Sequence, residues 1–328
     1  MVLNVQAVEA KSVNKKLLGL LVVIVVVASL IGYNEYLVSQ ELTGTIKVSG
    51  AFALYPLMVI WAQQYMKLNP KVVIEVSAGG AGKGMSDALS GLVDIGMISR
   101  NITAQEVQEG AFYVAVCEGA VVATISEQNP VLTQILSKGL TKHMFYEIFV
   151  AQNVTTWGQV VGNASITQPI HVYTRSDAAG SADTWAKFLG KKGQGDLKGV
   201  GVYGDPGLVQ AIQSDPLGIG YNNLAYAYDN TTGLQASGIS VVPIDFKNNG
   251  QIGNFYQNKT ALVQAIQDGQ YPMPPATLYY LVTKNQFTGV ALDFVKWILT
   301  DGQSYVPTAG YVALTSDVLS AQMAKLQS

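Results

Sequence analysis

The sequence predicts an α/β protein built from two domains behind an N-terminal apolar segment. The chain has 328 residues, of which 49% are apolar and 13% charged. It is therefore too apolar for a disordered chain and too long for one small core. Beyond residue 43, strands, small-residue loops and helices alternate, which is typical of an α/β fold with a mainly parallel sheet. Two long β-rich runs, near residues 115–125 and 277–283, divide this pattern.

The N-terminal segment is expected to anchor the chain in a membrane. Residues 15–33 read KKLLGLLVVIVVVASLIGY and carry no charge between residues 17 and 31. This length suits a short membrane span and also the core of a signal peptide. Lys11, Lys15 and Lys16 precede this uncharged run, so we expect residues 1–14 in the cytoplasm and the rest of the chain outside. A retained anchor is favoured over a cleaved signal because no clean cleavage site follows, and a buried core helix is the third alternative.

The first domain begins after a polar linker over residues 34–43. GTIKVSG (44–50) alternates as a strand, and residues 55–67 place apolar side chains at helical spacing. The unit then repeats as a strand over 72–76, a glycine-rich loop, an amphipathic helix and a strand over 94–98. In such sheets ligands bind at the carboxyl ends of the strands, where helix N-termini converge.

The β-rich run over residues 111–125 is predicted to cross into a second domain. There the sequence indicates strands over 169–174 and 217–221 and helices over 182–189 and 207–214. A strong strand over 277–283 and a closing helix over 290–299 follow. Because both long strands are candidate hinge crossings, we predict one lobe from residues 44–122 and 278–328. The other lobe is predicted from residues 123–277.

Composition excludes several kinds of function. The net charge of −2 argues against nucleic-acid binding. Cys117 is the single cysteine, so no intrachain disulfide can form, and two histidines cannot build a His-rich zinc site. Neither His143 nor His171 lies in a recognisable catalytic motif, so we expect neither an enzyme nor a bound cofactor. We expect packing roles for both histidines and for Trp61, Trp157 and Trp185.

Three loops of small residues each follow a strand and precede a helix: SGAFALYP (49–56), SAGGAGKG (77–84) and RSDAAGSAD (175–183). Small residues let backbone N–H groups approach a ligand closely, and the helix N-terminus behind them adds partial positive charge. Together such loops can form an anion site without lysine. The alternative is that they are ordinary strand–helix turns, which are common in any α/β fold.

The two arginines of the chain, Arg100 and Arg175, stand at predicted strand ends beside these loops. Arginine donates in a planar, bidentate way that suits a tetrahedral oxyanion. Ser181 can add a hydroxyl donor and, with Asp183, can cap the following helix. A surface salt bridge is the alternative role for Arg175. The sequence therefore predicts an oxyanion site that contains both arginines.

Five stretches in order resemble the extracytoplasmic phosphate-binding proteins of ABC phosphate importers. They are SGAFALYPL, EVSAGGAGKGMSDALSGLVDIGMISR, LTKHMFYEIFVAQNVTTWGQVV (140–161), TRSDAAGSADTWAKFL and DPLGIGYNNLAYAY (215–228). The resemblance runs from residue 44 to about residue 315. It implies a two-lobed type II periplasmic-binding-protein fold with a hinge, a monomeric state, and inorganic phosphate and ABC permease subunits as partners.

The ligand residues of that family carry over unevenly. Arg175, Asp177, Gly180 and Ser181 match its third loop. Hydroxyl residues are missing where the chain has Phe52, Ala53, Ala81 and Ala179, and Ser99 followed by Arg100 stands where some members have an acid. The resemblance thus implies an anion site made of Ala51, Phe52, Ala53, Gly80, Ala81, Ser99, Arg100, Arg175, Asp177, Ala179, Gly180 and Ser181, with backbone donors in place of the lost hydroxyls.

The sequence is therefore interpreted as a membrane-anchored solute-binding protein outside the cytoplasm, whose lobes close over phosphate. A binder of sulfate, molybdate or tungstate is one alternative, because an acid that accepts the phosphate proton is missing at Ser99. A surface structural or sensory protein that kept the fold without transport is the other. Five N-x-S/T sequons, at Asn101, Asn153, Asn163, Asn230 and Asn258, suggest an exported glycoprotein.

Overall fold

The computed structural model describes residues 42–327. The predicted tail (1–14), the apolar segment (15–33) and nearly all of the linker lie outside the described residues. Within the described part, no helix has the length and apolar character needed to cross a membrane. Residues 44–328 form one compact unit.

The first lobe holds three strands with parallel pairing, as the sequence pattern predicted. Strand β1 (Gly44–Gly50) pairs with β2 (Val72–Ala78) on one side and with β3 (Ile95–Ile98) on the other. Each strand leads into a helix, because apolar residues change from a period of two to a helical spacing after each small-residue loop. These helices are η1 (Phe52–Leu54), α2 (Tyr55–Leu68), α3 (Ala81–Ser90) and α4 (Ala104–Gln108).

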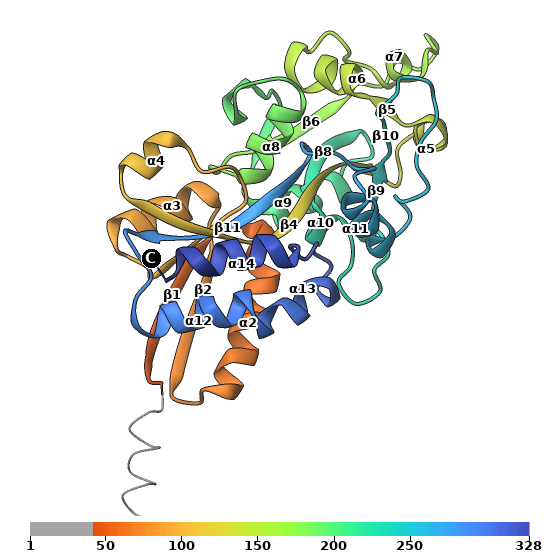
Figure 1. Ribbon diagram of the computed structural model, residues 1–328. Helices are drawn as coiled ribbons and strands as arrows, with labels where there is room; N and C mark the ends of the chain where they lie inside the picture. Colours follow the sequence, from red (N-terminus) through yellow and green to blue (C-terminus); the bar gives the residue numbers. More distant parts are fainter. Residues whose placement is uncertain (1–41, 328) are drawn as a thin grey trace, which may run out of the picture. The chain divides into compact units, whose positions relative to one another are not determined.

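The C-terminal part of the chain returns to the first lobe and covers it with helices. These are α12 (Gly289–Leu299), η4 (Asp301–Ser304), α13 (Tyr305–Thr308) and α14 (Ser316–Lys325). Figure 1 shows α12 beside α2, and the indole N–H of Trp61 on α2 donates to the carbonyl of Gly302 at 2.8 Å. Tyr311 then reaches the first small-residue loop, where its hydroxyl donates to the carbonyl of Ala53 at 2.8 Å.

The second lobe repeats the strand–loop–helix order. Its strands are β5 (Leu140–Thr141), β6 (His171–Arg175), β7 (Val200–Val202), β8 (Gly218–Asn223), β9 (Ile239–Val242) and β10 (Ile244–Asp245). Its helices are α5 (Leu132–Lys138), α6 (Lys142–Tyr146), η2 (Glu147–Ala151), α7 (Trp157–Val161), α8 (Gly180–Phe188), η3 (Gln194–Asp196), α9 (Gly204–Gln213), α10 (Leu224–Ala227) and α11 (Lys259–Gln267). β6 pairs in parallel with both β7 and β8.

Two long strands join the lobes, and their direction corrects the predicted parallel sheet. β4 (Ala111–Ser126) pairs with β11 (Ala276–Lys284) along its first part and with β8 and β9 along its second part. All of these pairings are antiparallel, and so is that of β11 with β3. The parallel prediction therefore holds on the flanks and fails at the centre, because crossing strands run back through the sheet without an intervening helix (Figure 1).

The core of the second lobe is aromatic. The ring centroid of Trp185 on α8 lies 5.2–5.8 Å from the ring centroids of Phe145, Phe149 and Tyr221. The predicted packing role is confirmed for the tryptophans, since Trp61, Trp157 and Trp185 are fully buried. It is wrong for His143 and His171, which are exposed. The rigid packing of α8 matters for the site, because the third small-residue loop ends at the first turn of this helix.

Candidate functional site

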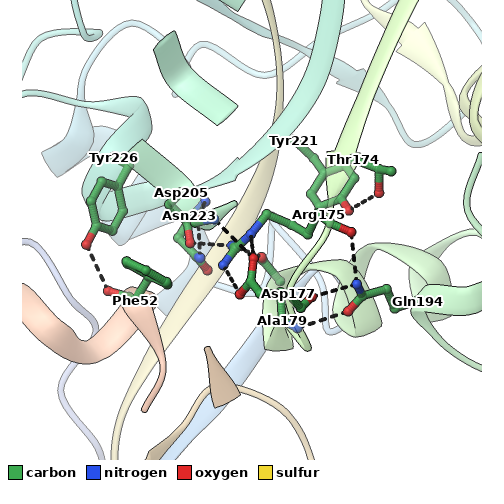
Figure 2. Close-up of polar contacts among 12 residues, drawn as sticks. Phe52, Thr174, Arg175, Asp177, Ala179, Gln194, Asp205, Tyr221, Asn223 and Tyr226 are labelled. Carbon is green, nitrogen blue, oxygen red and sulfur yellow. Dashed lines mark hydrogen bonds and ion pairs between the residues drawn. The ribbon is translucent and has the colours of Figure 1, made fainter. Parts of the chain in front are cut away.

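Arg175 lies at the end of β6, and its guanidinium group is at the centre of a buried polar cluster (Figure 2). Nε and Nη2 donate to the two carboxylate oxygens of Asp177, at 2.8 and 2.6 Å. Nη1 donates to Asp205 Oδ2 at 2.5 Å and to Ser181 Oγ at 3.1 Å. Within residues 42–327, these contacts leave a single Nη2 hydrogen of the guanidinium without a partner.

Asp205 is a member of this cluster that the sequence analysis missed. It lies in the first turn of α9, is fully buried, and accepts hydrogen bonds from the backbone N–H and side-chain amide of Asn223, at 3.1 and 2.7 Å. A signal for it existed in the sequence. Asp205 follows strand β7 and begins a helix, which is the same strand–loop–helix pattern that marked the other three loops.

The cluster carries one cation and two carboxylates. Burial alone would lower the pKa of Arg175, but the carboxylates of Asp205 and Asp177 outweigh that effect and raise the pKa further. Arg175 therefore remains charged. With both aspartates ionised, the buried group has a net negative charge, so the positive field that an anion needs must come largely from backbone N–H groups and helix N-termini.

The third loop brings the N-terminus of α8 beside Arg175. Gly180 and Ser181 are buried and form its first turn, where backbone N–H groups have no partner within the helix. The expectation that Ser181 and Asp183 cap this helix is wrong. The N-cap is Ala179 without a side-chain cap, because the Ser181 hydroxyl accepts from Arg175 and Asp183 accepts from the backbone of Gln194. Among residues 42–327 no acceptor takes the hydrogen of the Ser181 hydroxyl, so that hydrogen can be donated to a ligand.

The first loop places an aromatic ring on the arginine. The ring of Phe52 lies with its centroid 5.3 Å from the guanidinium carbon of Arg175, and the carbonyl of Phe52 accepts from Tyr226 Oη at 3.1 Å (Figure 2). The neighbouring Ala51 and Ala53 are buried. Residues 51–53 of this loop therefore offer backbone groups and one ring, but no hydroxyl.

The second loop touches the third loop directly. The backbone N–H of Gly82 donates to the carbonyl of Ala178 at 2.9 Å. Gly80 has a φ of +93°, and a Cβ there would lie 2.6 Å from Asp177 Oδ2, so only glycine fits. Ala81 is fully buried as the first residue of α3. The N-terminus of α3 thus faces the aspartate of the other lobe.

Ser99 and Arg100, which are adjacent in the chain, have different surroundings. Ser99 is buried against the third loop, where a Cβ on Gly180 would lie 2.3 Å from Ser99 Oγ. Arg100 faces Glu106 instead, donating to its two carboxylate oxygens at 2.6 and 3.0 Å. Its Nε lies 3.5 Å from Asp183 Oδ2. The structure therefore brings the three loops and Ser99 together around Arg175, and it directs the guanidinium of Arg100 to other partners.

Comparison with known proteins identifies relatives of this architecture. Residues 38–302 match the model of the PBP superfamily domain. The phosphate-binding protein PstS of Bacillus subtilis is 27% identical over 280 residues, which is 84% of this chain and 83% of the relative. PstS of Pseudomonas aeruginosa is 24% identical over 312 residues, covering 89% of this chain and 90% of the relative.

Solved structures agree on the fold. A substrate-binding protein from Clostridium perfringens that contains bound phosphate superposes with a TM-score of 0.68 at 22% identity, covering 83% of this chain and 100% of that one. An ABC-type phosphate transport receptor from Vibrio cholerae gives a TM-score of 0.60 at 18% identity, covering 82% and 100%. With its two α/β lobes and the matched family model, the chain belongs to the periplasmic-binding-protein (PBP) superfamily.

Proposed function

We propose that this protein captures inorganic phosphate outside the cytoplasm and delivers it to an ABC importer. One observation carries the proposal: a buried arginine, a serine hydroxyl and the N-terminus of α8 in one lobe face two small-residue loops of the other lobe. That arrangement can surround a tetrahedral oxyanion with donors from both sides. The names of the relatives, phosphate-binding protein and phosphate transport receptor, support phosphate as the anion.

The proposed ligand groups come mainly from the backbone. The N–H groups of Phe52 and Ala53 belong to the first loop, that of Ala81 begins α3, and those of Gly180 and Ser181 begin α8. The side chains that add to them are the Ser181 hydroxyl and the remaining Nη2 hydrogen of Arg175. Ala51, Gly80, Ser99, Asp177 and Ala179 shape the surroundings. Arg100 is left out of this set, because its guanidinium is bound to Glu106.

The buried carboxylates favour a protonated anion. Asp177 Oδ2 faces the second loop, close to Gly80, and can accept the proton of hydrogen phosphate. A fully deprotonated anion such as sulfate brings no proton and is repelled by the same oxygen. Asp177 thus accepts the phosphate proton, a role that a serine at position 99 cannot fill because it has no carboxylate. Phosphate is therefore preferred over sulfate.

Binding is proposed to occur by closure of the lobes. The hinge lies where β4 and β11 connect them, with one lobe formed by residues 44–122 and 278–328 and the other by residues 123–277. Phosphate contacts loops of both lobes, so it stabilises the closed arrangement by its higher affinity for that state. The permease then recognises the closed form.

The proposed location is the outer face of a membrane, with the apolar segment 15–33 as a single-pass anchor and a monomeric binding unit. Glycosylation is part of this proposal, because four of the sequon asparagines (Asn101, Asn153, Asn163 and Asn230) are exposed. Asn258 is half-buried, and its Oδ1 accepts from the N–H of Ala261 as the N-cap of α11. It is therefore the weakest of the five candidates.

Titration of ligand-stripped protein with phosphate tests the function. Ser181→Ala removes a hydroxyl donor to an anion, a bond worth about 1.5–3 kcal/mol, so we expect phosphate affinity to fall at least tenfold. Arg175→Lys keeps the charge but loses the planar fork, and we expect a larger loss. Calorimetry measures the phosphate affinity of both variants, and circular dichroism verifies that they fold. Unchanged affinity in both folded variants would contradict the proposal.

A surface sensory or structural protein that no longer transports is the second candidate. It is favoured by the pairing of Arg175 with its own carboxylates and by the ring of Phe52 on its face. In that case the stripped protein would bind neither phosphate nor sulfate at millimolar concentration, and closure would not depend on an anion.

A further inference from the structure

Gln194 connects three backbone groups of the third loop with one side chain. Its Nε2 donates to the carbonyls of Arg175 and Asp177, at 3.0 and 2.7 Å, and its Oε1 accepts from the N–H of Ala179 at 2.9 Å (Figure 2). These bonds span the loop from the end of β6 to the N-cap of α8. Gln194 itself comes from η3, which follows α8 in the chain and is not part of the loop.

The pattern of donors and acceptors selects glutamine at this position. Two carbonyls need a donor and one N–H needs an acceptor, and an amide supplies both at the end of one side chain. A carboxylate of the same shape would satisfy the N–H but would face both carbonyls with an acceptor. Because the printed hydrogen bonds of the Gln194 side-chain amide all go to backbone groups of the loop, Gln194 acts through the loop and not on a ligand.

A second interaction fixes Gln194 and extends to the other lobe. Asp183 Oδ1 accepts from the backbone N–H of Gln194 at 2.9 Å, while Asp183 Oδ2 lies 3.5 Å from Arg100 Nε. Arg100 is held by its paired contacts with Glu106 on α4. A continuous set of polar contacts therefore runs from the first lobe through Arg100, Asp183 and Gln194 to the backbone of the third loop.

We propose that Gln194 is the positioning residue for the anion-binding loop, and that Asp183 couples this position to lobe closure through Arg100. The inference rests on the proposed phosphate-binding function and deepens it. When the bonds of Gln194 are present, the N–H groups of Gly180 and Ser181 and the guanidinium of Arg175 keep one arrangement. When they are lost, the loop samples others, and apparent affinity falls with the fraction of competent protein.

The test uses Gln194→Glu in the full-length protein, with two measurements. Loss of two hydrogen bonds and the new repulsion predict phosphate affinity at least about tenfold weaker by calorimetry. Hydrogen exchange followed by mass spectrometry should show faster exchange in a peptide over residues 175–182, with or without phosphate. The exchange measurement does not depend on phosphate binding, so it tests Gln194 even if the proposed function fails.

Gln159→Glu is the matched control. Gln159 also lies in the second lobe and accepts from the backbone N–H groups of Thr155 and Thr156, away from the loop. We expect this variant to keep phosphate affinity and the exchange of residues 175–182. If Gln194→Glu behaves like this control in both measurements, Gln194 has no positioning role. If the wild-type protein binds no phosphate, the proposed function fails, and the exchange result alone decides on Gln194.

The link to closure is tested by a double-mutant cycle. Asp183→Asn keeps an acceptor for the N–H of Gln194 but removes the charge that faces Arg100, and Arg100→Gln removes the other charge. We expect each single variant to weaken phosphate binding by about two- to fivefold, as for a partly exposed ion pair. We expect the double variant to bind phosphate no more weakly than whichever single variant binds it less tightly. Strictly additive losses would overturn the coupling.

Discussion

The two arginines of the chain occupy similar places, since Arg175 ends β6 and Arg100 lies two residues after β3, each beside a small-residue loop. The side chain of Arg175 is 1% exposed and is held by Asp177, Asp205 and Ser181. The side chain of Arg100 is 13% exposed and is held by Glu106 and Asp183. The difference lies in the residues that follow. Asp177 pairs with Arg175 inside the third loop, while Arg100 pairs with Glu106 on α4 and with Asp183 at the end of that loop.

This contrast shows that a position after a strand does not define the role of an arginine. Both residues are charged, both pair with acids, and both sit at the lobe interface. What separates them is whether unsatisfied backbone N–H groups converge on the same point, as they do at the N-terminus of α8 beside Arg175. Arg100 instead pairs with Glu106 in the first turn of α4 and with Asp183, and these partners suit a contact between lobes.

The largest expected difference between the two arginines is in stability. Arg175→Gln leaves Asp177 and Asp205 buried without their cation, so we expect the free energy of unfolding to fall by about 3–5 kcal/mol. Arg100→Gln should cost less than about 1 kcal/mol, because its ion pairs are partly solvated. Urea denaturation of both variants measures the gap. Equal losses would show that the two clusters are energetically alike.

The sequence predicted much of this site because its signals are local. Small residues between a strand and a helix marked the three loops, and Arg175 and Asp177 lie two residues apart. Asp205 and Gln194 were missed, because the first is 30 positions from Arg175 and the second 19. Only the folded arrangement of β6, α8, η3 and α9 brings them together. The antiparallel centre of the sheet was missed for the same reason, since strand direction depends on distant pairing.

The role of Arg100 could have been predicted better from the sequence. Thr103 and Glu106 form a capping box at the start of α4, in which each side chain bonds the backbone of the other. The T-x-x-E pattern predicts this capping box, which holds a carboxylate near Arg100. In that position the carboxylate competes with any ligand for the guanidinium.

The next prediction concerns the ring that covers Arg175. Phe52→Ser removes a cation–π contact of about 0.5–2 kcal/mol and introduces a hydroxyl whose bond to an anion is worth about 1.5–3 kcal/mol. We expect phosphate to bind up to about tenfold more tightly in calorimetry. Tyr203→Ser is the control, since Tyr203 contacts the Phe52 ring at a centroid distance of 5.7 Å but is exposed. Weaker binding by Phe52→Ser would mean that the ring is part of the binding surface.

The smallest expected effect is the acid dependence of the Arg100 cluster. Burial alone would raise the pKa of Glu106, but hydrogen bonds from Arg100 and Thr103 outweigh it and lower the pKa below its ordinary value. Its stabilising contribution is therefore complete above the unfolded pKa of about 4.3 and is lost as pH falls through the lower folded value. Glu106→Gln should show a smaller loss of melting temperature between neutral and acid pH than the wild type. An identical pH profile would leave Glu106 without an energetic role.

Competition calorimetry is the decisive test of whether this protein binds phosphate in preference to sulfate. The full-length protein in detergent is unfolded and refolded to remove carried-over ligand, and is then titrated with phosphate at neutral pH with and without excess sulfate. We expect phosphate binding that sulfate leaves unchanged, because Asp177 and Asp205 oppose an anion that has no proton to share. Absence of phosphate binding, or equal displacement by sulfate, would contradict it.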